Sequence, residues 1–223
     1  MFTLKNIAVP CLAGLLIVAG AGRGQAQTKE SGILDRRVEA VTISEVNIVL
    51  ALAHIADEYD IPIGLEVAAA HKEPKEKKID ISIEKGSLRD LLEAIVAQDS
   101  RYSWKIIDGV VNVYPRANRD TLLNDLLDTR IQEFLLAKNT SLYRIRYSIV
   151  ELPEIKSKLE KAEVTAYTVA YTRMDFARLG EFSMRVSNVT LRELMNRIVR
   201  ESDVKFWILN RFGKNNELLI LNF

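Results

Sequence analysis

The chain has 223 residues, of which 48% are hydrophobic and 27% are charged, and its formal net charge is +1. This composition is typical of a folded globular protein and excludes an intrinsically disordered chain. The small net charge also argues against nucleic acid as a partner, because a phosphate backbone is bound through an excess of Lys and Arg.

The first segment has the order of residues found in a secretory signal peptide. Lys5 lies in a short polar start, residues 7–19 are almost wholly apolar, and Gly24-Gln25-Ala26 supplies small residues for cleavage. We expect cleavage after Ala26, with residues 19–21 as a second candidate site and a retained amphiphilic anchor as the alternative. The pattern predicts an exported protein.

Removal of residues 1–26 changes the charge and the cysteine content. Lys5 and Arg23 are the only charged residues in this segment, so the net charge moves from +1 to −1. Cys11 is the one cysteine of the chain and leaves with the segment, so we expect neither a disulfide nor a thiol nucleophile. No later apolar stretch approaches the roughly 20 residues of a membrane-spanning helix, so no transmembrane segment is expected in the mature chain.

The region between residues 38 and 67 predicts a strand, a helix and a second strand. Residues 38–43 form the first strand, and Asn47 is expected to cap a helix with an apolar inner face. Residues 61–67 extend again as a strand, and Pro62 places that strand near a sheet edge, because proline cannot donate a hydrogen bond to a neighbouring strand.

The region between residues 79 and 114 predicts a strand, a helix and a hairpin. Residues 79–83 alternate apolar and polar side chains, as a half-buried strand does. Ser87 is expected to cap a helix, with Asp90 as a weak version of the capping-box acid. Residues 102–107 and 110–114 are two strands, and Asp108-Gly109 forms the tight turn between them. Residues 116–125, which are polar and then helical in pattern, are expected to join two domains.

The second half repeats much of this pattern. Pairs at a spacing of 103 positions include the cap (87 and 190), an arginine (89 and 192), the apolar helix face and a tryptophan (104 and 207). A weaker match at a spacing of 93 relates the start of each half, so the second copy carries about ten extra residues, which we assign to a short helix at 154–163. A chance similarity between amphipathic helices explains the leucines, but not the shared arginine, cap and tryptophan.

Five stretches follow one another in the first copy: IVLALA at 48–53, IPIGL at 61–65, the alternating residues 79–83, SLRDLL at 87–92 and DGVVNV at 108–113. In this order they resemble the secretin and TonB short N-terminal (STN) domain. Residues 125–222 resemble it clearly only in their second half. The resemblance implies a bacterial periplasmic docking module, without catalytic residues, that serves an outer-membrane transport, secretion or signalling system.

These observations together predict an α+β fold of two tandem modules. Each module, at 27–116 and 117–223, has two helices packed against short mixed sheets in the order βαβ-βαββ. We expect Trp104 and Trp207 to be buried core residues rather than platforms for a ligand, because they follow equivalent helices at equal distances.

The residues offer little support for an enzyme, a cofactor or a metal site. His54 has Asp57 and Glu58 three and four positions further on, a spacing that could bring two ligands to a metal, but a solvated helix face is the expected alternative. His71 begins a loop of mixed charge. No phosphate-binding glycine loop or nucleophile elbow is present. We therefore expect no catalytic residue, no cofactor and no metal.

Two functional hypotheses remain. The first is a periplasmic adaptor whose exposed strand edges bind an unidentified protein partner by strand addition. The second is a module that binds a small molecule or a cell-wall glycan between the two copies, since ligand sites favour domain interfaces. For the first hypothesis, the expected edges are the last strand of each copy, with the candidate residues Val110, Val111, Val113, Leu218, Leu219 and Leu221.

Overall fold

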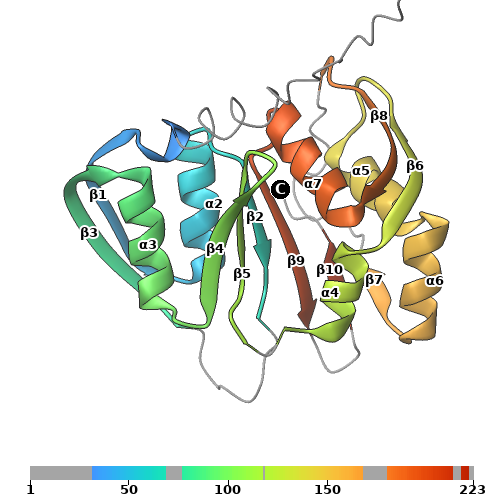
Figure 1. Cartoon of the computed structure of the whole chain (residues 1–223), viewed down its shortest axis with the longest axis horizontal. Helices are drawn as coiled ribbons and strands as arrows, with labels where there is room; N and C mark the ends of the chain where they lie inside the picture. The colour runs from blue at the N-terminus through green and yellow to red at the C-terminus, as the bar shows by residue number, and fades with distance from the viewer. Residues whose placement is uncertain (1–31, 69–76, 118, 168–179, 213–216, 221–223) are drawn as a thin grey trace, which may run out of the picture.

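The computed structural model describes residues 32–68, 77–117, 119–167, 180–212 and 217–220. The predicted signal peptide, Cys11, His71 and Leu221 lie outside these residues. The chain has an α+β fold, and Figure 1 shows its elements. In chain order they are β1 (Arg37–Val46), α2 (Ile48–Glu58), β2 (Ile63–Glu66), β3 (Ile79–Ser87), α3 (Leu88–Gln98), β4 (Tyr102–Ile107), β5 (Val110–Pro115), α4 (Thr121–Leu127), β6 (Arg130–Leu136), α5 (Leu142–Val150), α6 (Pro153–Lys161), β7 (Thr165–Tyr167), β8 (Met184–Thr190), α7 (Leu191–Glu201), β9 (Phe206–Phe212) and β10 (Glu217–Ile220).

The two halves of the chain repeat the same strand pairings. In the first half β1 pairs antiparallel with β3, and β5 lies between an antiparallel β4 and a parallel β2. In the second half β6 pairs antiparallel with β8, and β10 lies between an antiparallel β9 and a parallel β7. We call β4 and β9 counterparts, because each is the first strand of the terminal hairpin of its half.

The helices that precede these hairpins are also counterparts. Both α3 and α7 begin after a complete capping box. The side chain of Ser87 or Thr190 accepts a hydrogen bond from the backbone N–H of Asp90 or Glu193, and the carboxylate of that acid accepts one from the backbone N–H of the cap residue. Asp90, predicted as the shorter and weaker version of the capping-box acid, completes its box: its Oδ2 accepts from the Ser87 N–H at 2.8 Å. The extra residues of the second half divide its first helix into α5 and α6, with Pro153 in the first turn of α6.

A single six-stranded sheet joins the halves. Its order is β4-β5-β2-β9-β10-β7, so the two three-stranded sheets meet where β2 pairs in parallel with β9. β2 is therefore an interior strand, and the prediction that Pro62 marks an edge was wrong. Pro62 precedes the first residue of β2, and its carbonyl accepts from Val111 N–H at 3.0 Å, so its missing N–H is not needed in the ladder.

The shared sheet separates two cores (Figure 1). The first core lies between the β1–β3 sheet and one face of the six-stranded sheet, around α2 and α3. The second core lies on the other side, around α4, α5, α6, α7 and the β6–β8 sheet. β9 serves both, because successive side chains of a strand point to opposite faces: Phe206 and Ile208 enter the first core, and Trp207 and Leu209 enter the second.

None of the helices formed by the described residues is long and apolar enough to span a membrane.

Candidate functional site

The strands predicted to be free edges are interior strands. β5 carries Val110, Val111 and Val113 between β4 and β2, and these side chains are at most 4% exposed. β10 carries Leu218 and Leu219 between β9 and β7. The prediction was wrong because each hairpin's second strand gains a parallel neighbour that lies far away in the sequence.

Among the described strands, β4 ends the six-stranded sheet on one side and pairs with β5 alone. The N–H of Arg116, just after β5, donates to the carbonyl of Arg101 at 2.8 Å, so these two residues form a hydrogen-bonded pair. In an antiparallel ladder, hydrogen-bonded and non-hydrogen-bonded pairs alternate along the strands. Ser103 and Lys105 then direct their backbone groups toward β5. The backbone groups of Trp104 and Ile106 point away from the sheet, toward its open edge.

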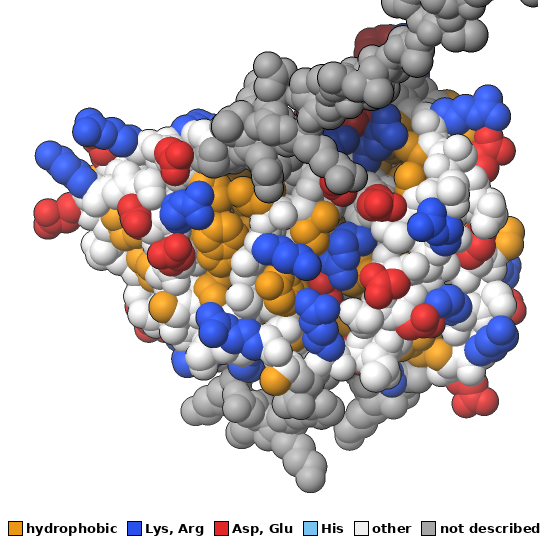
Figure 2. All heavy atoms as spheres, in the orientation of Figure 1, with side chains coloured by type: hydrophobic (Ala, Val, Ile, Leu, Met, Phe, Trp, Pro, Cys, Tyr) orange, Lys and Arg blue, Asp and Glu red, His pale blue; other side chains and the backbone are white. Residues whose placement is uncertain are grey.

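A groove of about 420 Å³ runs between this edge and α3. Figure 2 shows hydrophobic side chains reaching the surface between α3 and β4, bordered by charged side chains. Apolar and charged side chains together beside an unpaired strand edge are the combination found in sites that bind extended peptides. The residues lining the groove are Glu93, Val96, Ala97, Ser103, Trp104 and Arg116.

The two tryptophans differ in burial, although they are counterparts. Trp207 is fully buried, and its indole N–H donates to Asn196 Oδ1 at 2.9 Å. Trp104 packs against the first core but is only half-buried, and it lines the groove. The expectation of a buried core residue is therefore confirmed for Trp207, whereas Trp104 packs against the core but is not fully buried.

The difference arises because the counterpart edge on β9 is occupied. β2 lies along β9, where Ile63 N–H donates to the Lys205 carbonyl at 2.8 Å and Val67 N–H donates to the Leu209 carbonyl at 2.9 Å. The Trp207 ring lies over Gly64 of this added strand so closely that a Cβ on Gly64 would be 2.1 Å from a ring carbon. The strand thus covers Trp207, whereas no described strand covers Trp104.

An ion pair also joins α7 to β2 beside Trp207. Arg192 on α7 reaches Glu66 on β2 at 2.6 Å, with the two side chains 14% and 4% exposed. Two further bonds attach α7 to the end of the β4–β5 hairpin: Asn196 donates to the Ile107 carbonyl at 3.4 Å, and Arg200 donates to the Asp108 carbonyl at 2.6 Å. This contact fills the space between the copies in which the alternative hypothesis places a ligand.

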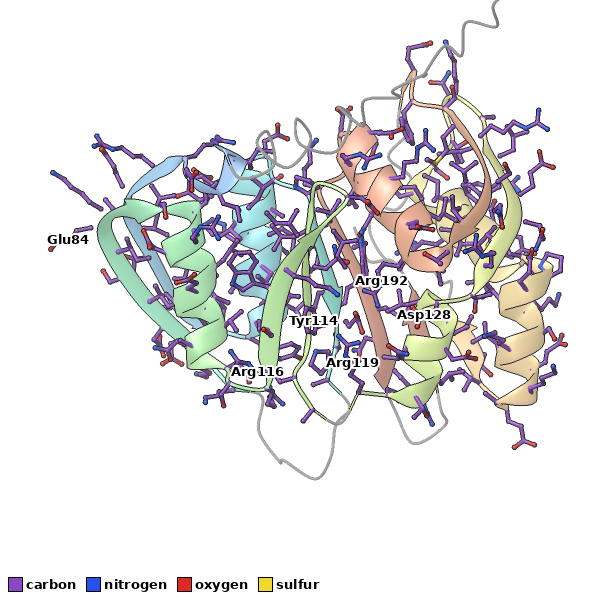
Figure 3. The ribbon with its side chains drawn as sticks, viewed as in Figure 1. Glu84, Tyr114, Arg116, Arg119, Asp128 and Arg192 are labelled. Atoms are coloured by element: carbon purple, nitrogen blue, oxygen red, sulfur yellow. The ribbon has the colours of Figure 1, made fainter. Side chains whose placement is uncertain are left out.

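Two arginines flank the open edge of β4. The guanidinium of Arg89, the counterpart of Arg192, lies 5.6 Å from the centre of the Trp104 ring, and its nearest carboxylate is that of the exposed Asp35 at 3.9 Å. Arg116 lies beside the lower end of β4 (Figure 3), and its Nε donates to the Tyr102 carbonyl at 2.6 Å. Tyr102 is the counterpart of Lys205, so Arg116 occupies the position where Ile63 binds on β9.

His54 was expected to lie on a solvated helix face rather than to bind a metal. His54 is exposed on α2, and within the described part of the chain no three His, Cys, Asp or Glu side chains are grouped as metal ligands. Sequence reasoning identified Trp104 but assigned it to the core. The missing signal was the pairing partner of each hairpin, since a tryptophan beside an occupied edge and one beside an open edge have the same sequence pattern.

The sequence matches no protein-family model, and no curated protein sequence is significantly similar to it. The second half of the chain supplies the comparison instead: β9 shows which kind of neighbour an edge of this type accepts.

Proposed function

We propose that this protein is a non-catalytic adaptor of the STN type, exported to the periplasm, which binds an extended segment of a partner protein along β4. The observation that carries the proposal is the occupied counterpart edge, where β2 lies on β9 as a parallel strand. A strand added to β4 would gain main-chain hydrogen bonds from Trp104 and Ile106 and would cover the Trp104 ring.

The surface beside β4 supports this function better than it supports catalysis or ligand binding between the copies. The groove offers apolar and charged side chains beside a strand edge, which suit an extended peptide. The contact between the copies is already filled by Trp207, Gly64 and the ion pair of Arg192 with Glu66. Strand addition therefore uses an open edge whose counterpart, in the other half of the chain, already holds an added strand.

The test selects peptides from a displayed library of random octapeptides on the mature protein and measures their binding to Ile106→Pro. Proline at this position deletes an outward N–H and leaves the hydrogen bonds between β4 and β5 in place. We expect selected peptides to lose binding to Ile106→Pro and to keep it with Ile106→Ala, which changes the side chain alone. Peptides that bind both variants equally, or a selection that yields none, would overturn the proposal.

A second proline variant provides the matched control for folding. Val111 N–H donates to the Pro62 carbonyl inside the sheet at 3.0 Å, so Val111→Pro removes an interior ladder bond. We expect Val111→Pro to be unfolded or to melt far below the parent protein by circular dichroism, whereas Ile106→Pro keeps its melting temperature within a few degrees. Equal melting temperatures for the two variants would contradict the assignment of β4 as the edge.

Export is tested independently of binding. The N-terminal order of residues supports cleavage after Ala26, so the periplasmic protein is expected to begin near Gln27. Mass spectrometry of the intact protein from the periplasmic fraction measures this directly. A full-length chain that keeps Met1 and remains in the cytoplasm would exclude export.

A further inference from the structure

We infer that the β4 edge selects a segment in which a glycine is followed, two residues later, by an acidic residue, bound parallel to β4. This inference rests on the proposed function and specifies its ligand. The template is Gly64-Leu65-Glu66, the segment that occupies the counterpart edge on β9.

The glycine follows from the tryptophan. On β9 the Trp207 ring leaves no room for a Cβ on Gly64, whose nearest ring atoms would lie 2.1–2.4 Å away. Trp104 occupies the counterpart position on β4, and its backbone also points to the open edge. A residue opposite Trp104 must be small for the same reason, so the ring discriminates against any larger side chain there.

The acid follows from the arginine. Residues two apart in a strand point to the same face, so Glu66 lies on the Gly64 side of β2, beneath α7. Arg192 of α7 binds Glu66 there in a largely buried pair at 2.6 Å. Arg89 holds the same place on α3, above Trp104, and within the described part of the chain its ion pair is a long one, with exposed Asp35 at 3.9 Å. A carboxylate two residues beyond the glycine would lie within its reach.

The two edges also differ in ways that shape binding. The counterparts of Asn196 and Arg200 on α3 are Glu93 and Ala97. The two hydrogen bonds by which Asn196 and Arg200 attach α7 to the β4–β5 turn therefore have no equivalent made by the same residue types at the open edge. Arg116 donates a hydrogen bond from its Nε to the carbonyl of Tyr102, which is the acceptor that the first N–H of an added strand would use. Arg116 therefore competes with the ligand, and Arg116→Ala is expected to raise affinity.

The occupant is a segment of another protein rather than a second copy of this chain. Gly64-Leu65-Glu66 of a second copy is already paired on both sides, with β5 and β9. The sheet's other terminal strand, β7, has only three residues, Thr165–Tyr167, and none of them is acidic. Neither strand can supply the required pattern without unfolding.

The experiment uses a labelled peptide with the sequence of residues 61–68 (IPIGLEVA) and follows its fluorescence anisotropy with the mature protein. Compared with this peptide, we expect a peptide with valine in place of the glycine to lose binding, and one with glutamine in place of the glutamate to bind about tenfold more weakly. Arg89→Glu should reverse the charge preference, so that a peptide with lysine in that place binds better than the parent peptide. Trp104→Ala should abolish binding to β4 while leaving β9 intact, which separates binding at β4 from exchange with β2.

Each outcome separates the inference from the function on which it rests. If the glycine and valine peptides bind equally and both depend on Ile106, the edge binds strands but the pattern is wrong. If library peptides bind through Ile106 and the 61–68 peptide does not bind, the inference also fails and the function stands. If no peptide depends on Ile106, the function itself fails. A dimer detected by light scattering and lost in Trp104→Ala would overturn the choice of another protein as occupant.

Discussion

At the scale of single residues, one glycine determines how the two halves fit together. Gly64 has an ordinary place in β2, and its importance comes from the Trp207 ring that lies against it. Without a side chain at position 64, the ring can cover the neighbouring strand, and its N–H can reach Asn196 on α7. The contact combines a large buried aromatic surface with a specific hydrogen bond, which is how buried tryptophans are usually accommodated.

We predict that Gly64→Ala destabilises the protein by about 1–3 kcal/mol, the range for an overpacked core, because the added methyl group forces the Trp207 ring to move. Urea unfolding measures the change. Gly32→Ala is the matched control, since a Cβ there meets no atom within 4 Å, and its stability should match the parent protein. If the two variants unfold at the same urea concentration, the close contact at Gly64 does not exist in solution.

At the scale of elements, the capping boxes fix where α3 and α7 begin. Ser87 accepts from the Asp90 N–H at 3.2 Å, and the Asp90 carboxylate accepts from the Ser87 N–H at 2.8 Å. The bond from the Ser87 hydroxyl, then the backbone N–H of Ser87 and more weakly the charge of Arg89, lower the pKa of Asp90, and they outweigh the opposing effect of desolvation. The folded helix thus favours the ionised form of the Asp90 carboxylate.

The direction of that shift predicts how stability depends on pH. Because the pKa of Asp90 is lower in the folded than in the unfolded chain, its contribution is complete above the unfolded value of about 3.9. The contribution is lost as the pH falls through the lower folded pKa. We expect Asp90→Asn to flatten this part of the stability profile, measured by urea unfolding from neutral to acidic pH. A profile as steep as that of the parent protein would show that the carboxylate has no such role.

The hairpins show how elements with the same sequence pattern acquire different roles. β4 and β9 each follow a capped helix and carry a tryptophan at the same position. β9 pairs with β2 and becomes interior, while β4 keeps an open edge among the described strands. The proposed binding surface is therefore defined by which strand lacks a neighbour rather than by a distinct motif.

At the scale of the whole molecule, the shared sheet couples two cores that each half could only partly complete. Phe206 and Ile208 of the second half pack into the first core, and Val110 of the first half packs into the second. The buried pair of Arg192 with Glu66 adds a polar contact across the same boundary. Breaking such a pair on one side leaves a buried charge without a partner, which costs about 3–5 kcal/mol.

This coupling predicts that the two halves unfold together. Each half carries one tryptophan, so Trp104→Phe leaves Trp207 as a single fluorophore that reports on the second half and keeps the contact between the halves intact. In this variant, we expect the fluorescence transition in urea to coincide with the loss of helix by circular dichroism, as in a two-state process. In contrast, separate transitions in this variant would mean that the β2–β9 contact does not hold the halves together.

The sequence by itself determined the local structure and the repeat. Caps, apolar helix faces and the Asp108-Gly109 turn depend on residues close together in the chain, and the structure contains the predicted helices α3 and α7 and the hairpin of β4 and β5. The two residues of that turn both have positive φ angles, as a two-residue hairpin turn requires. The α+β class followed from the order of these elements.

Only the tertiary structure decided which strands are interior and which edge is open. Strand pairing joins backbone groups that are distant in the sequence, and a strand pattern records which face is apolar but not which neighbour lies beside it. For this reason the sequence predicts sheet edges at Pro62 and Val111, although Val111 lies in an interior strand and Pro62 directly precedes another, and it does not show that Trp104 borders an open edge. The contact of Gly64 with Trp207, like the open edge beside Trp104, exists because two separately encoded halves meet along one sheet.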